Sequence, residues 1–174
     1  MLVNDNFEFP NLRGATYEYL IKHFAESAGK KGGEFYTPVE VVQLMVSIAK
    51  PQAGETVYDS TIGSGGFAIE AHQYVEDQGE DPNNLYVRGQ ESNGTVWSIC
   101  NINLILHNIH RFAIENGDTR EEPALLDGQG RPFKAERALA NAPFTQDYEP
   151  ANLTRSERFW ECTPTKGKAD LMFG

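Results

Sequence analysis

A glycine-rich turn that directly follows a short β-prone run is the feature that most constrains how this chain folds. The run Thr56-Val57-Tyr58 ends in Asp59, and residues 60–66 form a turn with three glycines before an amphipathic stretch over residues 67–75. A strand, a tight turn and a helix in this order form a ligand site of nucleotide type at the carboxyl end of a first parallel strand. Glycine lacks a Cβ and tolerates positive φ, so the backbone can pass close to a ligand. The first N–H groups of the following helix point at the same place.

The same turn also satisfies the loose dinucleotide fingerprint G-x-G-x-x-A, through Gly63, Gly65 and Ala68. That fingerprint expects an acidic residue about 20 residues further on, at the end of a second strand. The nearest good candidate is Glu91, which lies later than that, although the acidic, turn-rich stretch 76–84 can absorb the difference as a loop. Spacing alone therefore keeps a nicotinamide-dependent dehydrogenase as a distant alternative.

The bulk composition favours a globular cytoplasmic protein. The chain has 174 residues, of which 40% are hydrophobic, and this suits one domain with a real core. No apolar run approaches membrane-spanning length, and no basic and apolar signal segment opens the sequence. The two cysteines, Cys100 and Cys162, are isolated, and the four histidines have no convincing ligand spacing, so neither a disulfide nor a metal site is expected.

The net charge of −10 restricts how the chain could handle nucleic acid. Proteins that bind DNA unaided carry a basic footprint, because neutralising phosphates drives affinity. If DNA is the substrate, another subunit or another part of the polypeptide must supply most of the contact.

Hydrophobic periodicity and turn residues predict the remaining elements. Helices are expected over residues 15–28, 37–49, 66–75 and 95–107, and strands over residues 56–59, 85–90, 112–115 and 137–140. Residues 1–12, 120–133 and 145–174 are expected to be extended or loop. This alternation predicts an α/β fold with a parallel sheet. The carboxyl ends of its strands then bring four polar residues to one edge of the sheet, namely Asp59, Glu91, Asp118 and Asn141.

Two of the helices carry more detailed expectations. In the helix over residues 37–49, Thr37 is expected as N-cap, Pro38 as first residue and Glu40 as the partner in a capping box. Its apolar side is expected to be buried through Val41, Val42, Leu44, Met45 and Ile48. In the helix over residues 95–107, one side is expected to carry Val96, Ile99, Ile102, Asn103 and Leu106, with Asn108 at the C-terminal cap.

Five motifs in a fixed order carry a family resemblance. They are Gly33-Glu34-Phe35-Tyr36-Thr37-Pro38, the glycine turn, Gly89-Gln90-Glu91-Ser92-Asn93, Asn116-Gly117-Asp118-Thr119 and Asn141-Ala142-Pro143-Phe144. Together they resemble the modification (M) subunit of type I restriction–modification systems, an S-adenosylmethionine-dependent DNA adenine-N6 methyltransferase. The resemblance runs from about residue 13 to residue 170. No single motif is decisive, but five in the same order argue against chance.

The resemblance implies a Rossmann-like methyltransferase fold, with a partial parallel sheet in the order 3-2-1-4 and helices on both faces. Residues 1–36 would be an N-terminal lead-in and helix, and residues 37–174 a truncated catalytic domain. Family members have an N-terminal helical region, and they continue past the position of Gly174 into further strands. We therefore expect a truncated core whose fourth strand is an exposed edge, through which the chain could self-associate.

The resemblance also implies a set of residues that bind S-adenosylmethionine. The turn Phe35-Tyr36-Thr37-Pro38 would hold its methionine end, and Asp59 with the turn Gly63-Ser64-Gly65-Gly66 would surround its amino-acid moiety. Glu91 would accept hydrogen bonds from the two ribose hydroxyls, and Asp118 would accept one from the adenine amino group. Phe67, Ser92 and Thr119 complete the expected set.

The last motif would hold the target base. Asn141 and the carbonyl of Ala142 would accept from the target adenine amino group, and Phe144, which follows Pro143, would stack on the flipped base. Catalysis would be by positioning, with no covalent enzyme intermediate. The family's usual motif is Asn-Pro-Pro-Phe. Ala142 keeps the carbonyl but reduces rigidity, because proline fixes φ and alanine does not.

The resemblance finally implies partners, namely a specificity (S) subunit and a restriction (R) subunit, with DNA reached through the complex. The chain alone is expected to be inactive. A non-catalytic cofactor-binding or interaction module is the alternative, which Ala142, the missing strands and the negative charge favour. A methyltransferase of another planar nitrogen, such as a glutamine amide or an RNA base, is a third interpretation. The motif at residues 35–38 argues against it.

Taken one at a time, the site residues also have purely structural interpretations. Asp59 could cap a helix, Glu91 and Asp118 could be solvated strand ends, and Phe144 could be core.

Overall fold

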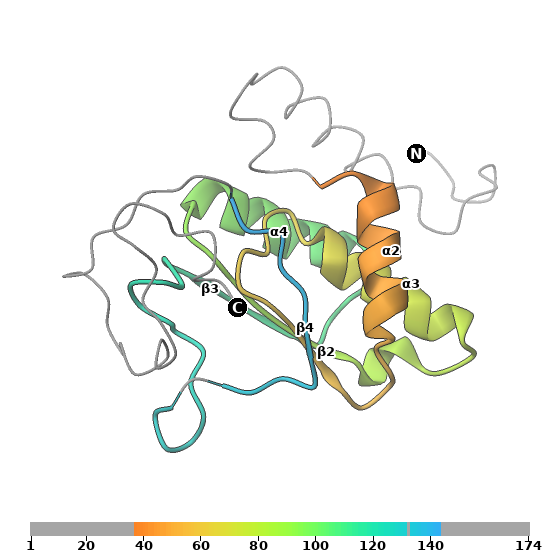
Figure 1. The fold of residues 1–174 in the computed structure, drawn as a ribbon. Coiled ribbons are helices and arrows are strands. Elements are labelled where there is room, and N and C mark those ends of the chain that lie inside the picture. Colours follow the sequence, from red (N-terminus) through yellow and green to blue (C-terminus); the bar gives the residue numbers. More distant parts are fainter. Residues whose placement is uncertain (1–36, 132, 144–174) are drawn as a thin grey trace, which may run out of the picture.

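The computed structural model describes residues 37–131 and 133–143. They form a four-stranded sheet in the order β3-β2-β1-β4 with helices packed against it (Figure 1). The elements are α2 (Val39–Ala49), β1 (Thr56–Asp59), α3 (Gly66–Asp77), the 3₁₀ turn η3 (Pro82–Asn84), β2 (Tyr86–Glu91), α4 (Gly94–Leu106), β3 (Phe112–Asn116) and β4 (Arg137–Ala138). The predicted Rossmann-like fold class and strand order are confirmed. The helix predicted over residues 15–28 lies outside the described residues.

All strand pairings are parallel, so the carboxyl ends meet at one edge of the sheet. β1 pairs with β2 from Thr56–Tyr86 to Asp59–Gly89, and β2 pairs with β3 from Val87–Phe112 to Glu91–Asn116. β4 pairs with β1 at only two positions, Val57–Arg137 and Tyr58–Ala138. The polar residues that end the strands are thereby collected on one side of the molecule.

The described helices pack on one face of this sheet. The register places Val57, Val87 and Ile114 on the same face, and each belongs to an apolar cluster that contains helix residues. The first cluster joins Val57 to residues of α2 and α3, and the second joins Val87 and Ile114 to residues of α3 and α4. Two right-handed crossovers that advance in the same direction along a sheet place their helices on the same face.

Helices were expected on the second face too, but within the described residues a non-helical segment covers it. The side chain of Gln90 donates to the carbonyl of Glu122 at 2.8 Å and accepts from the amide of Ala124 at 3.0 Å. The guanidinium carbon of Arg88 lies 4.2 Å from the ring centroid of Phe133. The chain returns from β3 to β4 through this segment, so no helix is formed in the described part of that connection.

The predicted start of α2 is wrong in its capping. The helix begins at Val39, its N-cap is Pro38, and no side chain among the described residues bonds to the cap. The carbonyl of Pro38 accepts from the amides of Val41 and Val42 at 3.0 and 3.1 Å. Because proline has no side-chain acceptor, the capping box expected from Thr37 and Glu40 does not form, and the hydroxyl of Thr37 is used elsewhere.

The predicted burial of α2 is also partly wrong. Val42 and Val46 are buried and Met45 is half-buried, but Val41, Leu44 and Ile48 are 43%, 60% and 71% exposed. One side of the helix packs on α3 and the sheet, and the apolar residues on its other side have no cover from that contact.

The fourth helix shows the same kind of difference. Ile102 of α4, expected on the same side as Val96 and Asn103, is exposed, while the buried positions are Val96, Cys100, Asn103 and Leu104. Asn108 was expected at the C-terminal cap, but the C-cap is His107, and Asn108 is the next residue, with φ 58° in the left-handed region.

Candidate functional site

The turn after β1 requires glycine at two positions. Gly63 and Gly65 have φ of 56° and 92°, in the left-handed region. A Cβ on Gly65 would lie 3.2 Å from Sγ of Cys100 and 3.3 Å from Cδ2 of Leu104, both on α4. The turn therefore lies tightly against α4.

The carboxylate of Glu91 joins the end of β2 to this turn. Oε2 of Glu91 accepts from the amide of Gly63 at 3.1 Å, and Oε1 accepts from the amide of Asn93 at 2.8 Å. The hydroxyl of Ser92 lies 3.5 Å from the same Oε1. The amide of Ile62 also donates to the carbonyl of Gln90 at 3.1 Å. The structure thus brings together two motifs that the sequence placed about thirty residues apart.

Asn103 supports the turn from behind, and sequence reasoning did not include it among the site residues. Its side chain is 1% exposed, and Nδ2 donates to the carbonyl of Ser64 at 3.0 Å. Within the described residues, Oδ1 of Asn103 has no hydrogen-bond partner. The signal in the sequence is an amide on the buried side of an otherwise apolar helix.

Asp59 lies under the turn as a buried carboxyl group. It is 3% exposed, and its Oδ1 accepts from the amide of Thr61 at 2.9 Å. Burial raises the pKa of Asp59 to about 7, and the charge of Glu91 adds to the rise, while the Thr61 amide opposes it. A cation bound at this edge would favour the ionised form, so the carboxyl suits a positively charged ligand.

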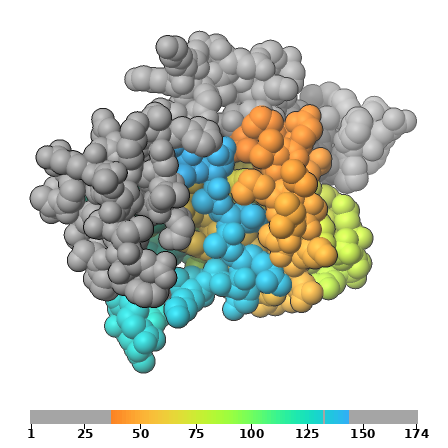
Figure 2. All heavy atoms as spheres, in the orientation of Figure 1, coloured from red at the N-terminus to blue at the C-terminus, as the bar shows by residue number. Residues whose placement is uncertain are grey.

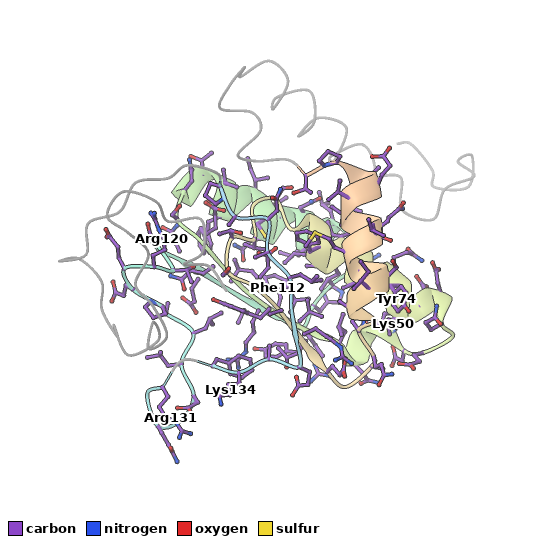
Figure 3. The ribbon with its side chains drawn as sticks, in the orientation of Figure 1. Lys50, Tyr74, Phe112, Arg120, Arg131 and Lys134 are labelled. Carbon is purple, nitrogen blue, oxygen red and sulfur yellow. The ribbon has the colours of Figure 1, made fainter. Side chains whose placement is uncertain are left out.

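Asp118, after β3, is engaged by a neighbouring arginine. Its Oδ1 accepts from the backbone amide and Nε of Arg120 at 2.9 and 3.0 Å, and its Oδ2 accepts from Nη2 of Arg120. Burial alone would raise the pKa of Asp118, but the hydrogen bonds and charge of Arg120 hold it below its usual value. Arg120 is itself buried, beyond the carboxyl end of β3 (Figure 3), and sequence reasoning missed it.

The side chain of Thr119 contacts the turn after β1, whereas that of Phe67 lies in the core. The hydroxyl of buried Thr119 donates to the carbonyl of Ser60 at 2.7 Å, so the segment after β3 reaches across the end of β2 to the turn after β1. Phe67 is buried in the apolar cluster with Val42 and Val57. Its side chain is therefore part of the core, and only its backbone borders the turn.

The segment after β4 is brought to the start of α2. Nδ2 of Asn141 donates to Oγ1 of Thr37 at 3.1 Å. Asn141 is exposed, and Ala142 and Pro143 are half-buried. Phe35, Tyr36 and Phe144 lie outside the described residues, so the proposed roles of these three side chains have no structural account.

The described ranges contain neither a metal-binding cluster nor a membrane-spanning helix. Residues 37–131 and 133–143 contain no group of three or more His, Cys, Asp or Glu side chains that could hold a metal ion. No helix in the same ranges has the length and apolar character needed to cross a bilayer.

Comparisons with known proteins agree with the predicted resemblance. The model of the N-6 DNA Methylase family matches residues 10–174. The chain is 31% identical over 163 residues to the type I restriction enzyme HindI methylase subunit of Haemophilus influenzae, covering 92% of this chain and 35% of that one. It is 33% identical over 173 residues to the MpnII methylase subunit of Mycoplasma pneumoniae, covering 92% of this chain and 31% of the relative.

A solved structure extends the agreement to the fold. The methyltransferase subunit of a type I restriction–modification system from Streptococcus thermophilus superimposes with a TM-score of 0.78 at 30% identity, covering 98% of this chain and 36% of that one. The chain thus spans about a third of the length of the relatives it matches. The five ordered motifs, the parallel sheet and these matches agree, and the chain belongs to the N-6 DNA methylase family.

Proposed function

We propose that this chain binds S-adenosylmethionine at the carboxyl edge of β1 and β2, and forms the cofactor-binding core of a DNA adenine-N6 methyltransferase. The observation that carries the proposal is the contact between Glu91 and the glycine turn, in which Oε2 of Glu91 accepts from the amide of Gly63 at 3.1 Å. In this contact an acceptor carboxylate lies beside the backbone of a glycine turn, the combination that suits a nucleoside with a ribose diol.

The residues present fit this cofactor. A carboxylate has about four acceptor positions. The amides of Gly63 and Asn93 occupy one position on each oxygen of Glu91, and the Ser92 hydroxyl lies 3.5 Å from Oε1, so the group retains capacity for a ribose hydroxyl. The cofactor carries positive charge on its sulfur and on its amino group. The carboxyl groups of Asp59 and Glu91 lie close enough for Glu91 to raise the pKa of Asp59, and they provide negative charge for that end of the ligand.

We assign the remaining contacts from the family resemblance. The segment 35–38 holds the methionine end, the turn Gly63-Ser64-Gly65-Gly66 approaches the amino-acid moiety, and Ser92 lies beside Glu91 at the ribose. Asp118 and Thr119 border the adenine. Because Arg120 donates to both carboxylate oxygens of Asp118, an adenine amino group would share that carboxylate with the guanidinium.

The transfer itself needs little from the protein beyond positioning. When bound, S-adenosylmethionine supplies a methyl group on a positively charged sulfur. Asn141 and the carbonyl of Ala142 accept hydrogen bonds from the target adenine amino group and so direct its nitrogen. Phe144 stacks on the extruded base. No covalent enzyme intermediate is required, and the rate advantage comes from holding the two reacting groups in the correct geometry.

DNA contact must come mainly from other polypeptide. With a net charge of −10, the chain lacks the basic footprint that phosphate neutralisation requires. The relatives are named as subunits of type I restriction enzymes. We therefore propose that the chain acts within an assembly that contains a specificity subunit, which grips and reads the DNA, and a restriction subunit. Such an assembly works in the cytoplasm, where its DNA lies.

The first experiment is calorimetric titration of the purified chain with S-adenosylmethionine, with NAD as the control ligand. Saturable binding of the first ligand alone supports the site. Asp59→Asn combined with Glu91→Gln should then weaken binding at least tenfold, because both carboxylates are lost. Equal heats for the two ligands, or an unchanged affinity in the double variant, would contradict the assignment.

A second candidate function is a cofactor-binding module that does not methylate. The net charge of −10 favours it, as does alanine in place of proline at position 142. Transfer of a labelled methyl group to adenine-containing DNA, measured with and without a specificity subunit, separates the two functions. Detectable transfer in either condition rejects the non-catalytic module.

A further inference from the structure

The hydroxyl of Thr37 contacts the proposed target-base motif instead of the helix that it precedes. Within the part of the chain that the structure describes, no side chain caps the start of α2, whose N-cap is Pro38. Oγ1 of Thr37 accepts from Nδ2 of Asn141 at 3.1 Å, across 104 residues of sequence. Figure 2 shows the segment that ends at residue 143, in blue, beside the start of α2, in orange.

Packing beneath this contact fixes both partners. The amide of Leu139 donates to the carbonyl of Tyr58 at 2.9 Å and so extends the β4–β1 pairing by one residue. The side chain of Leu139 is buried in the same cluster as Val42 and Val46 of α2. The chain two residues before Asn141 is therefore held against the helix that begins two residues after Thr37.

The direction of the hydrogen bond matters for chemistry. An asparagine amide has a donor end, the NH₂ group, and an acceptor end, the oxygen, and a half-turn about its last torsion exchanges them. A target amino group is a donor, so it needs the oxygen. When Nδ2 of Asn141 is occupied by Thr37, Oδ1 is left as the acceptor. In this structure the hydroxyl of Thr37 accepts, although a hydroxyl can also donate. The contact therefore holds the side chain of Asn141 in place, and protection of its NH₂ group reports which end of the amide faces Thr37.

We infer that Thr37 is a positioning residue, which holds the amide of Asn141 with its oxygen available to the amino group that is methylated. The identity of that amino group rests on the proposed function, whereas the contact itself does not. Valine at position 37 keeps the shape of threonine and removes the acceptor. Serine keeps the acceptor, so it should restore what valine loses.

Nuclear magnetic resonance of the ¹⁵N-labelled chain tests the contact directly. The Asn141 NH₂ signals are assigned by their loss in Asn141→Asp. In the unaltered chain and in Thr37→Ser, one of these protons should exchange with water about two- to tenfold more slowly than in Thr37→Val, which is the protection given by a hydrogen bond of ordinary strength. Thr95→Val is the matched control, because Thr95 is an exposed residue of the first turn of α4 and should leave the signals unchanged.

The outcomes separate the inference from the proposed function. Fast exchange in the unaltered chain, or no change in Thr37→Val, overturns the assignment of Thr37. These signals need neither cofactor nor DNA, so they remain informative if the chain proves not to methylate. In the assembly that transfers methyl groups, Thr37→Val should lower kcat measured at saturating S-adenosylmethionine, with recovery in Thr37→Ser. The KM for that cofactor is expected to rise as well, because Thr37 belongs to the segment assigned to its methionine end. A rise in that KM alone would show that Thr37 serves the cofactor, and would overturn the positioning role.

Discussion

The amide of Gly63 donates a hydrogen bond of 3.1 Å to Oε2 of Glu91, which lies 28 residues further along the chain. The end of β2 therefore holds the turn that follows β1. On the other side of the turn, Nδ2 of Asn103 holds the carbonyl of Ser64. The turn is thus fixed by one carboxylate at the sheet edge and one amide from α4, and each of these contacts can be removed separately.

Glu91→Gln should weaken the binding of S-adenosylmethionine about ten- to a hundredfold, because hydrogen bonds to charged groups contribute roughly 1.5–3 kcal/mol. Calorimetry measures the change. Glu76→Gln, at an exposed position of α3, makes the same chemical change away from the turn and should bind normally. Normal binding by Glu91→Gln would remove this carboxylate from the ribose site.

Gly65→Ala should destabilise the protein more than Gly54→Ala. The two glycines have almost the same φ, 92° and 91°, so adding a Cβ has the same conformational cost at both positions. A Cβ at position 54 meets nothing within 4 Å, whereas one at position 65 meets Cys100 and Leu104 at 3.2 and 3.3 Å. Overpacking of this kind costs about 1–3 kcal/mol. Urea unfolding gives the difference through the midpoints, and equal midpoints would contradict the tight packing of the turn.

The sequence predicted the edge of the sheet well, because its signals are local. Glycine turns, strand-ending acids and an Asn-x-Pro motif occur at the ends of short apolar runs, and parallel strands bring those ends together. Asp59, Glu91 and Asn141 could therefore be placed without a structure. Asn103 could not, because its partner Ser64 lies 39 residues away and their contact depends on packing. Arg120 pairs with Asp118, two residues before it, but nothing in the local sequence indicates that this arginine is buried. The helical period gave α2 an apolar side, but which of its residues face α3 depends on how the helix lies on the sheet.

Asn103→Leu should separate stability from cofactor binding. The substitution removes Oδ1, a buried acceptor without a partner in the described residues, and this favours the folded state by about 1–3 kcal/mol. It also removes the donor to Ser64, so the thermal midpoint should be unchanged or higher while the affinity for S-adenosylmethionine falls. Asn101→Leu is the control, because Nδ2 of Asn101 donates within α4 to the carbonyl of Trp97 at 2.7 Å. A parallel loss of stability and affinity would show that Asn103 serves only the core.

Asp59→Asn should change how stability depends on pH. The pKa of Asp59 is raised from 3.8 to about 7 in the folded protein, chiefly by burial. Between these values the folded chain binds more protons than the unfolded chain, so the contribution of Asp59 to stability falls as pH rises and becomes level above about 7. The asparagine side chain stays neutral, so the free energy of unfolding of the variant should rise relative to that of the parent protein as the pH increases from about 5.5 to 8. The difference should grow by about 2 kcal/mol over this range, since one pKa unit corresponds to about 1.4 kcal/mol. Urea unfolding of both proteins across this range measures the gap, and a constant gap would contradict the raised pKa.

The same carboxyl group should make cofactor binding depend on pH. A cation at the sheet edge favours the ionised form of Asp59, so binding S-adenosylmethionine should release a proton near neutral pH, and its affinity should rise as pH increases through about 7. In Asp59→Asn this rise should disappear. Titrations in two buffers with different ionisation heats count the released protons, and S-adenosylhomocysteine, which lacks the charge on sulfur, should release fewer. Equal release for the two ligands would show that the sulfonium charge is not felt by Asp59, and would leave the amino group as the cation beside it.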